Sequence, residues 1–582
     1  RRRSRRRLPV RSSLATEELV TAFDQLCLQP DDLRPAALFY GVPMSGRSSA
    51  PPGRRRGPPE FAAIAPLAGL LLTLFVFVAD VIPLGVPGEW VWPRQPLPQD
   101  GAELADRLFW PLLAGLLLIA VAMFGELELS RPRLTRIQCV MHLILLTGST
   151  LLWHTAVLQS ASSPHRELRP LWVLYDRSAS GYFLRTLADR RPLRQFLAEY
   201  ESEAAKGDVL HAGTHPPGLL LLNRAALAAA RLPGSGFGRL AATAVSLQPA
   251  EAIDAFRLVE TEASLAPRLT DSQLAALALT ALGSLLICSL LPGTVYLLTR
   301  QFVQERDAWR SAALAAVLPC IDMFQPRSDV LYPTSSLLLL TLLTGSLLQK
   351  RLLPRLTLAA IGGFVLAGCL TVSLAHLPIL AAAVLFAALH TFAREDWKIG
   401  LRQTLVSVGI TGATFLCCVL LVQWLTDCSL PRIWRLNLSN HAGFYLQYPR
   451  TWWKWLPVNL AEMSLATGLP AMLLVPAALR RALQTVADSS AAARPAGLLC
   501  LALTATWCLL WLSGKNMGEA ARLWCFAAPW WLVCLSMPTS GSGQAPLKRS
   551  NWRLLFVCQL LACTATTALV SGYHLMQNDV PG

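Results

Sequence analysis

Charged residues are scarce in this 582-residue chain. Asp, Glu, Lys and Arg together make up 15% of it, whereas hydrophobic residues make up 53%. A soluble globular protein carries about 25% charged residues, so this composition excludes that class and is typical of a membrane protein. The net charge of +16 does not indicate a nucleic-acid partner, because basic residues gather on the cytoplasmic side of membrane proteins.

The chain also lacks cysteine pairs at metal-binding spacing. Its 14 cysteines are scattered, and no CxxC pair recurs at the spacing of a zinc site, so neither a structural metal nor a disulfide framework is predicted. No GxxxxGK[ST] or GxGxxG loop stands where it could hold a nucleotide.

Apolar runs define the architecture. A membrane-spanning helix needs about 20 mainly apolar residues, and thirteen stretches qualify. Three of them cover residues 61–81, 108–124 and 137–158. The others begin near Gln273, Ala308, Leu331, Leu356, Leu377, Gln403, Leu456, Pro495, Trp524 and Leu554. The sequence therefore predicts an all-α polytopic membrane protein with about 13 transmembrane helices.

The polar segments divide the chain. Residues 1–60 are rich in arginine, serine and proline and are predicted to form a basic, disordered cytoplasmic tail. Residues 61–136 carry two transmembrane helices, and 137–582 form the transmembrane core, which includes a large outer loop at 159–272. Within that loop, 219–232 is apolar but short and carries arginine, which predicts an interfacial amphipathic helix.

Basic residues predict the orientation. With the N-terminus inside, all the short inner loops are basic, as the positive-inside rule requires. Their cations are Arg131, Arg133, Arg136, Arg300, Arg306, Arg310, Lys350, Arg351, Arg355, Arg394, Lys398, Arg402, Arg480, Arg481, Arg494, Lys548, Arg549 and Arg553. The prediction is a multi-pass protein of the cell (inner) membrane, with a cytoplasmic N-terminus and an extracytoplasmic loop at 159–272.

The stretch 211–218, His-Ala-Gly-Thr-His-Pro-Pro-Gly, predicts a rigid corner. A residue before proline is pushed toward extended geometry, and a second proline suits the first turn of a helix that begins near Pro217. His211, Thr214 and His215 would lie at the start of that helix. The stretch alone is as typical of a plain helix start as of a binding site.

Other polar groups fall on the same predicted outer face, where polar groups near a bilayer tend to mark function. They include Glu89, Asp176, Asp329, His376, Asn440, His441, Tyr445 and the segment 515–522. Each has a structural interpretation by itself, such as capping a helix, but their shared side favours a single extracytoplasmic site.

Three motifs carry a family resemblance. They are Asp176-Arg-Ser-Ala-Ser-Gly-Tyr-Phe183, His215-Pro-Pro217 and Gly518-Glu-Ala-Ala-Arg522. Together with the topology they resemble the GT-C membrane glycosyltransferases, in particular the protein mannosyltransferase-like and aminoarabinose-transferase-like families. The resemblance implies transfer of a hexose or pentose from a polyprenyl-phosphate carrier to a lipid, polysaccharide or protein acceptor, with inversion of the anomeric centre.

The resemblance leaves two carboxylates open as the catalytic base. Family members show paired acids in an outer loop after the first span, whereas here Arg177 follows Asp176 and the loop follows the third span. Asp176 is favoured by its Gly-Tyr-Phe context and its position before His-Pro-Pro. Glu89, in Pro87-Gly-Glu-Trp-Val-Trp92, is the alternative.

The leaving phosphate needs cations, and arginine can bind it through two parallel hydrogen bonds. The expected substrate-binding residues are His211, Thr214, His215, Tyr182, Asp329, Lys515, Glu519, Arg522 and Arg450. Glu519 is also expected to pair with Arg522 at i,i+3 spacing. No metal site is predicted, although the resemblance leaves a divalent cation open because some relatives use one.

Two other functions remain compatible with the sequence. A transporter or flippase of lipid-linked or anionic substrates would be expected to show internal repeats and charges in mid-span, whereas here no repeat is evident and the polar groups lie at one face. The second is a non-catalytic subunit that helps to assemble envelope polymers.

Overall fold

The computed structural model describes residues 61–79, 81–131, 135–177, 179–209, 213–232, 234–262, 268–487, 493–537 and 547–573. These residues are mostly helical, with one small ribbon formed by β1 (Gly85–Val86) and β2 (Trp90–Val91). The predicted tail of residues 1–60 and His211 lie outside the described residues.

Long apolar helices build the body of the protein. Ten described helices are long and apolar enough to cross a membrane, or up to eleven if one bent pair counts as a span. They contain α2 (Phe61–Val78), α3 (Gly101–Glu128), α4 (Arg136–Val157), α11 (Asp271–Ser289) with α12 (Leu291–Thr299), α15 (Tyr332–Leu348), α16 (Leu352–Val372), α17 (Leu377–Phe392), α18 (Trp397–Thr426), α23 (Arg494–Leu512) and α26 (Arg549–Leu569). This is the architecture of an all-α polytopic membrane protein, as the composition predicts.

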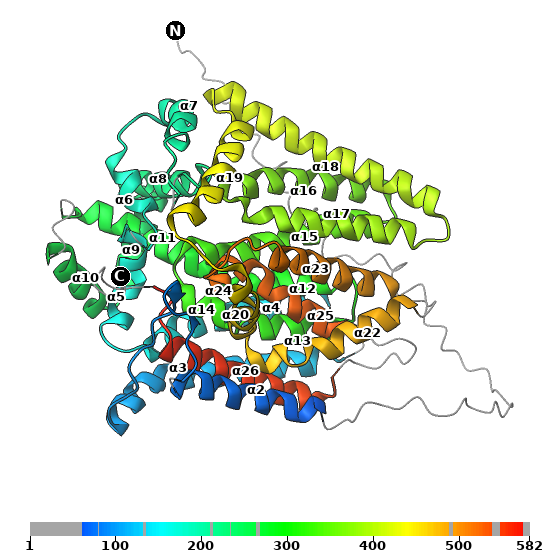
Figure 1. The fold of residues 1–582 in the computed structure, drawn as a ribbon, viewed down its shortest axis with the longest axis horizontal. Helices are drawn as coiled ribbons and strands as arrows, with labels where there is room; N and C mark the ends of the chain where they lie inside the picture. The colour runs from blue at the N-terminus through cyan, green and yellow to red at the C-terminus, as the bar shows by residue number, and fades with distance from the viewer. Residues whose placement is uncertain are drawn as a thin grey trace, which may run out of the picture.

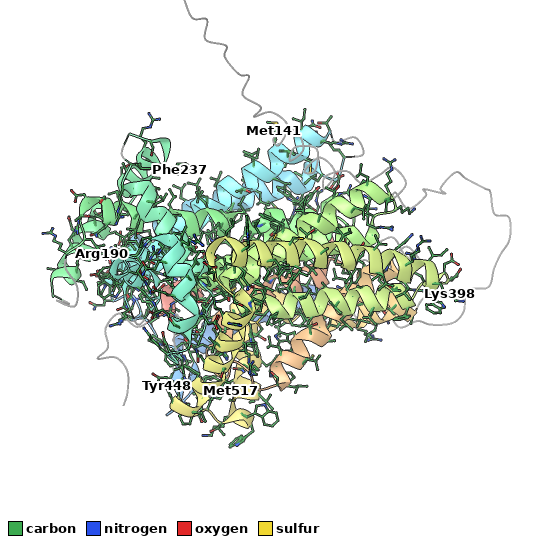
Figure 2. All side chains as sticks on the ribbon, turned by 90° about the horizontal axis from the view of Figure 1, so that it is seen from above. Met141, Arg190, Phe237, Lys398, Tyr448 and Met517 are labelled. Atoms are coloured by element: carbon green, nitrogen blue, oxygen red, sulfur yellow. The ribbon has the colours of Figure 1, made fainter. Side chains whose placement is uncertain are left out.

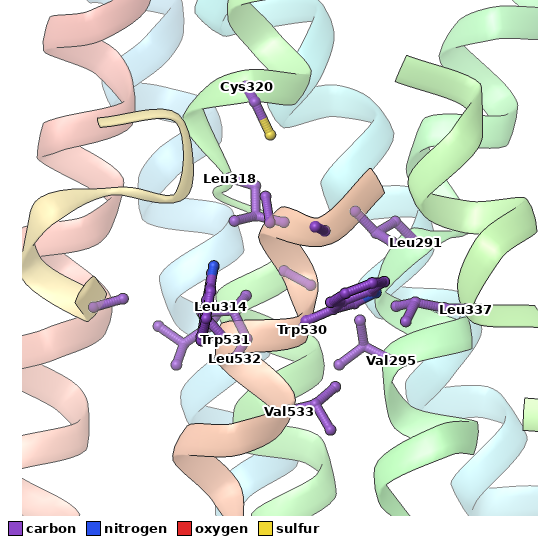
Figure 3. Packing of buried hydrophobic residues seen from close by; sticks show 14 of the residues in the cluster. Leu291, Val295, Leu314, Leu318, Cys320, Leu337, Trp530, Trp531, Leu532 and Val533 are labelled. Atoms are coloured by element: carbon purple, nitrogen blue, oxygen red, sulfur yellow. The ribbon is translucent and has the colours of Figure 1, made fainter. Parts of the chain in front are cut away.

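The number of spans differs from the predicted thirteen at two places, near Ala308 and Trp524. The first holds only α13 (Glu305–Ala315) and α14 (Pro319–Phe324), and the second holds α24 (Ala520–Leu523), a 3₁₀ turn at Cys525–Ala527 and α25 (Ala528–Ser536). These helices are too short to span, and α13 packs against α25 in the protein core. Figure 3 shows Leu314 of α13 beside Trp530 and Trp531 of α25. Their apolar side chains are explained by burial in protein rather than by lipid.

One predicted span is sharply bent. It consists of α20 (Trp452–Thr467), α21 (Leu469–Met472) and α22 (Val475–Ala487), and its two parts meet at 108°. The bend occurs at Gly468, whose φ is +101°, and a Cβ there would lie 2.0 Å from Nε2 of Gln559 on α26. Only glycine fits this position, because it tolerates a positive φ and leaves room for the neighbouring helix.

Six helices of the predicted outer loop gather at one end of the long helices (Figure 1). They are α5 (His165–Tyr175), α6 (Tyr182–Ala188), α7 (Leu193–Ala204), α8 (Gly218–Ala230), α9 (Gly236–Ser246) and α10 (Ala250–Glu262), preceded by the 3₁₀ helix η2 (Leu158–Ser160). The same end carries α19 (Leu430–Gln447), which contacts α7. In Figure 2, Arg190 of this end and Lys398 of a predicted inner loop lie at opposite ends of the molecule.

The helix after the two prolines begins at Gly218, close to the predicted position. At 13 residues it is too short to span, and it packs against α6, α9 and α11. A Cβ at Gly218 would lie 2.5 Å from the carbonyl oxygen of Thr371, so the glycine allows the start of α8 to approach the end of α16 closely. This contact fixes the corner against a long helix.

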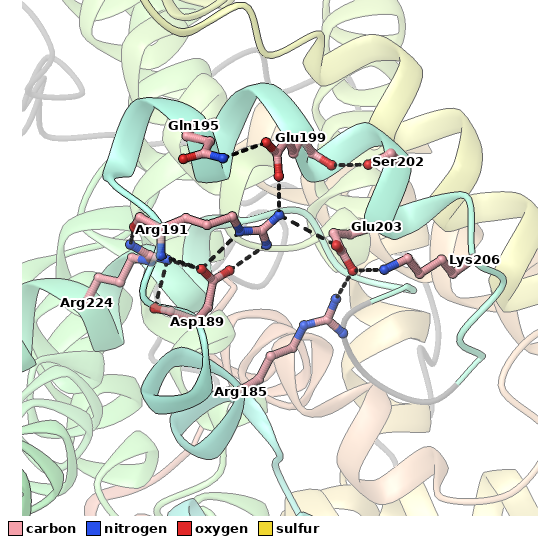
Figure 4. A network of polar contacts seen from close by, with 9 residues as sticks. All are labelled: Arg185, Asp189, Arg191, Gln195, Glu199, Ser202, Glu203, Lys206 and Arg224. Atoms are coloured by element: carbon pink, nitrogen blue, oxygen red, sulfur yellow. Dashed lines mark hydrogen bonds and ion pairs between the residues drawn. The ribbon is translucent and has the colours of Figure 1, made fainter.

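A network of ion pairs joins α6, α7 and α8 (Figure 4). Arg191 pairs with Asp189 and Glu199 at 2.6 Å each, and Arg224 of α8 pairs with Asp189 at 3.0 Å. Glu203 adds ion pairs to Arg191 and Lys206. The network therefore ties the corner helix to the rest of the outer region.

Candidate active site

Asp176 ends α5 and organises the turn that follows. Its backbone carbonyl accepts hydrogen bonds from the N–H groups of Ser180 and Gly181, and its Oδ2 accepts one from the N–H of Ala179 at 2.8 Å. Gly181 has a φ of +71°, which glycine adopts at low cost, and α6 starts at the next residue. The turn thus fixes the carboxylate of Asp176 and places Tyr182 directly after it.

Tyr182 and His215 contact each other. Their ring centroids lie 5.7 Å apart in an edge-on arrangement, and Oγ1 of Thr214 lies 3.1 Å from Nδ1 of His215. The hydroxyl of Tyr200 donates to the carbonyl of His215 at 2.9 Å. Burial, together with nearby groups that include Asp329, raises the pKa of Tyr182 well above its usual value. The tyrosine is therefore a neutral hydroxyl at neutral pH.

Arg522 and Glu519 form the ion pair that their spacing predicts, with Nη2 and Oε2 3.0 Å apart. Glu519 has a φ of +56° and follows Gly518 at +80°, so the chain turns tightly before α24. Burial lowers the pKa of Arg522, but Glu519, Asp329 and Tyr182 more than offset this, and the pKa is raised. Arg522 is thus a permanent cation that interacts with Tyr182 of the Asp176 motif and with Asp329.

Arg327 connects these groups to Asp176. It lies between α14 and the 3₁₀ helix η3 (Ser328–Leu331), and its exposed fraction is 7%. Burial and the charge of Arg522 lower the pKa of Arg327 to about 10, while Glu519, Asp329 and Asp176 act in the opposite direction. At neutral pH it remains charged. Arg327 was not among the residues expected from the sequence, although it lies two positions before Asp329, which was expected.

Glu89 occupies a different environment. Its carboxylate accepts hydrogen bonds from the backbone N–H of Thr451 at 2.8 Å and from Nε1 of Trp455 at 2.7 Å, and it pairs with Nζ of Lys454 at 3.4 Å. Burial raises the pKa of Glu89, but these bonds outweigh it and bring the pKa to about 2. A carboxylate so strongly stabilised in its charged form is a weak base.

Glu89 and its partners Thr451, Lys454 and Trp455 are called the clamp below, and Arg450 lies beside them. Its guanidinium donates to the carbonyl of Glu89 and stacks over the rings of Trp90 and Trp455, 5.6 Å from each centroid. It also interacts electrostatically with Glu519. The expected phosphate ligand Arg450 is therefore near the Arg522 pair, but a protein carbonyl already engages it.

Lys515 is linked to the site by its electrostatic interaction with His441. Lys515 is exposed, and His441 on α19 interacts electrostatically with both Lys515 and His215. Burial, followed by these two neighbours, lowers the pKa of His441 below its usual value. His441 is therefore a neutral ring at neutral pH, in a position to donate or accept a hydrogen bond.

The structure thus brings together Asp176, Tyr182, Thr214, His215, Asp329, Glu519 and Arg522, adds Lys515 at the margin, and holds Glu89 and Arg450 in a neighbouring clamp. Within the described residues, no group of three or more His, Cys, Asp or Glu side chains could hold a metal ion.

Comparison with known proteins gives little beyond this. No protein-family model matches the chain, and no curated protein matches it. Among solved structures, the crystal structure of the Archaeoglobus fulgidus oligosaccharyltransferase in complex with zinc and sulfate is similar at 14% identity with a TM-score of 0.34. The match covers 56% of this chain and 45% of that one, so it spans less than half of the archaeal protein. At this level of similarity, function has to be inferred from the chain's own residues.

Proposed function

We propose that this protein is an integral membrane glycosyltransferase that moves a sugar from a polyprenyl-phosphate carrier to an acceptor at the outer face of the membrane. The observation that carries the proposal is that α24, which bears Arg522 and its ion pair with Glu519, contacts both α14 and η3, the two elements on either side of the buried Arg327. Asp176 and Asp329 also interact electrostatically with Arg327. In an inverting sugar transfer, a carboxylate can act as the base and cations can stabilise the leaving phosphate.

In this reaction the acceptor hydroxyl oxygen attacks the anomeric carbon while the bond from that carbon to the phosphate oxygen breaks. Asp176 accepts the hydroxyl proton, and its orientation is set by the hydrogen bond from Ala179. The phosphate departs with the bonding electron pair, and Arg522 stabilises the developing negative charge. His215, Thr214 and Tyr182 supply rings and hydroxyl groups that orient the sugar.

An apolar cavity of about 390 Å³ offers space for the lipid chain of the donor. It lies between α2, α20 and α26, and its lining includes Leu72, Val76 and Leu465. Ala521, the residue before Arg522, also lines it. A prenyl chain in this cavity would therefore place its phosphate close to Arg522.

Replacement of Asp176 by Asn tests the proposal. General base catalysis contributes about 10²–10⁴-fold to a rate, so we expect Asp176→Asn to lower kcat for sugar transfer by at least about 100-fold without unfolding the protein. The assay uses purified protein in liposomes with a panel of polyprenyl-phosphate hexoses and pentoses. Intrinsic tryptophan fluorescence on heating reports whether the variant is folded.

Glu89→Gln is the matched carboxylate variant. If folded Glu89→Gln protein loses transfer and Asp176→Asn protein retains it, the base is Glu89. Solute or lipid translocation by the native protein, with no sugar transfer from any donor in the panel, would instead favour a transporter or flippase.

A further inference from the structure

Arg327 differs from every other buried arginine that the structure describes. Arg107, Arg169, Arg310 and Arg355 are as deeply buried, with exposed fractions of 1–6%. Each of these four guanidinium groups donates to a backbone carbonyl, and two of them also pair with a carboxylate. The guanidinium of Arg327 forms no hydrogen bond or ion pair with any described residue, and its Nε is buried without a partner.

An unpaired buried charge is costly. Breaking a buried ion pair destabilises proteins because it leaves a desolvated charge uncompensated, and arginine is rarely left fully buried without a partner. The helix α24, which carries Arg522, contacts both α14 and η3, the elements that flank Arg327, and the electrostatic neighbours of Arg327 are Arg522, Glu519, Asp329 and Asp176. Glu519 pairs with Arg522 at 3.0 Å rather than with Arg327. The guanidinium of Arg327 therefore keeps its donors available for a ligand, and Arg522 is a second cation nearby.

We propose that Arg327 and Arg522 together form an oxyanion site that binds the phosphate of the lipid-linked donor. Two planar guanidinium groups from different segments can share the oxygens of one phosphate, which is the geometry that favours arginine over lysine. The inference rests on the proposed function for the identity of the donor. The binding site itself does not depend on sugar transfer.

Binding of a short prenyl phosphate tests the site directly. We expect geranyl phosphate to bind the purified native protein, and Arg327→Met to raise its Kd at least about tenfold, because charge-assisted hydrogen bonds are lost. Arg327→Lys keeps the charge but loses the planar fork, so its Kd should lie between the two. Geraniol, which has the chain without the phosphate, should be insensitive to both substitutions.

A stability measurement separates ligand binding from a structural role. Arg355 has an exposed fraction of 6%, close to the 7% of Arg327, but its Nε donates to the carbonyl of Gln349 at 2.9 Å. Arg355→Met leaves that buried carbonyl unpaired and should lower Tm. Arg327→Met removes an unpaired charge, so the Tm without ligand should be unchanged or higher, and geranyl phosphate should no longer raise it.

Three outcomes overturn the inference. These outcomes are no binding of geranyl phosphate by the native protein, unchanged binding by Arg327→Met, or a fall in Tm as large as that of Arg355→Met. Equal affinity for inorganic phosphate would assign the pair to a free anion and overturn its assignment to a lipid-borne phosphate. If binding depends on Arg327 but no sugar is transferred, the proposed function fails and the phosphate site stands. If sugar transfer proceeds normally in Arg327→Met, the phosphate site fails and the proposed function stands.

Discussion

Two clusters of charge in this protein contain similar residues but differ in how they are paired. At the predicted inner end, Glu126 of α3 is 1% exposed and pairs with Arg310 at 2.6 Å, Arg549 at 2.9 Å and Arg553 at 3.6 Å. In the candidate active site, Arg522 has one carboxylate partner and Arg327 has none among the described residues.

The difference indicates which charges serve the fold and which are available to a ligand. At Glu126, one carboxylate joins α3, the buried helix α13 and α26, so its negative charge is paired within the protein. At Arg327 the neighbouring carboxylates act at a distance, and the donors of the guanidinium remain unused. A buried charge that the fold does not pair is the better candidate for substrate binding.

The first prediction breaks the paired cluster. Glu126→Gln leaves Arg310, which is 6% exposed, without the partner on α3, and loss of a buried ion-pair partner costs about 3–5 kcal/mol. We expect a marked fall in Tm followed by tryptophan fluorescence, with sugar transfer per folded molecule unchanged. A loss of transfer in a variant that keeps its native Tm would contradict the assignment of Glu126 to the fold.

The positions of the helices could be predicted from the sequence, but not all their lengths. Each of the thirteen predicted segments coincides with a helix, because apolar composition locates such helices well. The segments near Ala308 and Trp524 are nevertheless short. Burial in a protein core and burial in lipid demand the same side chains, so hydropathy does not distinguish a short buried helix from a span.

The site shows a similar division. The motifs around Asp176 and His215 lie close together in the sequence, but Arg522 follows more than 300 residues later, and α24, which carries it, contacts η3 beside Arg327. Two features had no local signal. The partners of Glu89 are Thr451, Lys454 and Trp455, more than 360 residues later. The isolation of Arg327 is a property of its surroundings, which the sequence does not display.

The second prediction concerns Glu89, which lies in the clamp beside the site. Its carboxylate is 12% exposed, and despite burial, hydrogen bonds from Thr451, Trp455 and Lys454 lower its pKa from 4.5 to about 2. A shift of this size corresponds to a stabilisation on the order of 3 kcal/mol. Because the folded pKa is depressed, this stabilisation is present above pH 4.5 and is lost as the pH falls toward about 2. Glu89→Gln should therefore lower Tm at neutral pH by several degrees and flatten the dependence of Tm on acidic pH.

Glu167, which pairs with Arg166 at 2.8 Å near the start of α5, provides a carboxylate control outside the clamp. Glu167→Gln should leave the acid dependence of Tm closer to that of the native protein. If Glu89→Gln abolished transfer while leaving Tm and its acid dependence unchanged, Glu89 would be assigned to the chemistry rather than to the clamp.

The third and smallest effect is expected in the partly exposed network of Figure 4. Glu203 has a side chain 21% exposed and meets Arg185, Arg191 and Lys206 at 2.8–3.6 Å. Exposed ion pairs contribute about 0–1 kcal/mol, and Arg191 keeps Asp189 and Glu199 when Glu203 is lost. Glu203→Gln should thus change Tm by no more than a degree or two, and less at high salt, because salt screens exposed charges. A fall as large as that of Glu126→Gln would show that pairing at the surface supports this fold as strongly as pairing in its interior, and the contrast between the two clusters would then rest on the unpaired Arg327 alone.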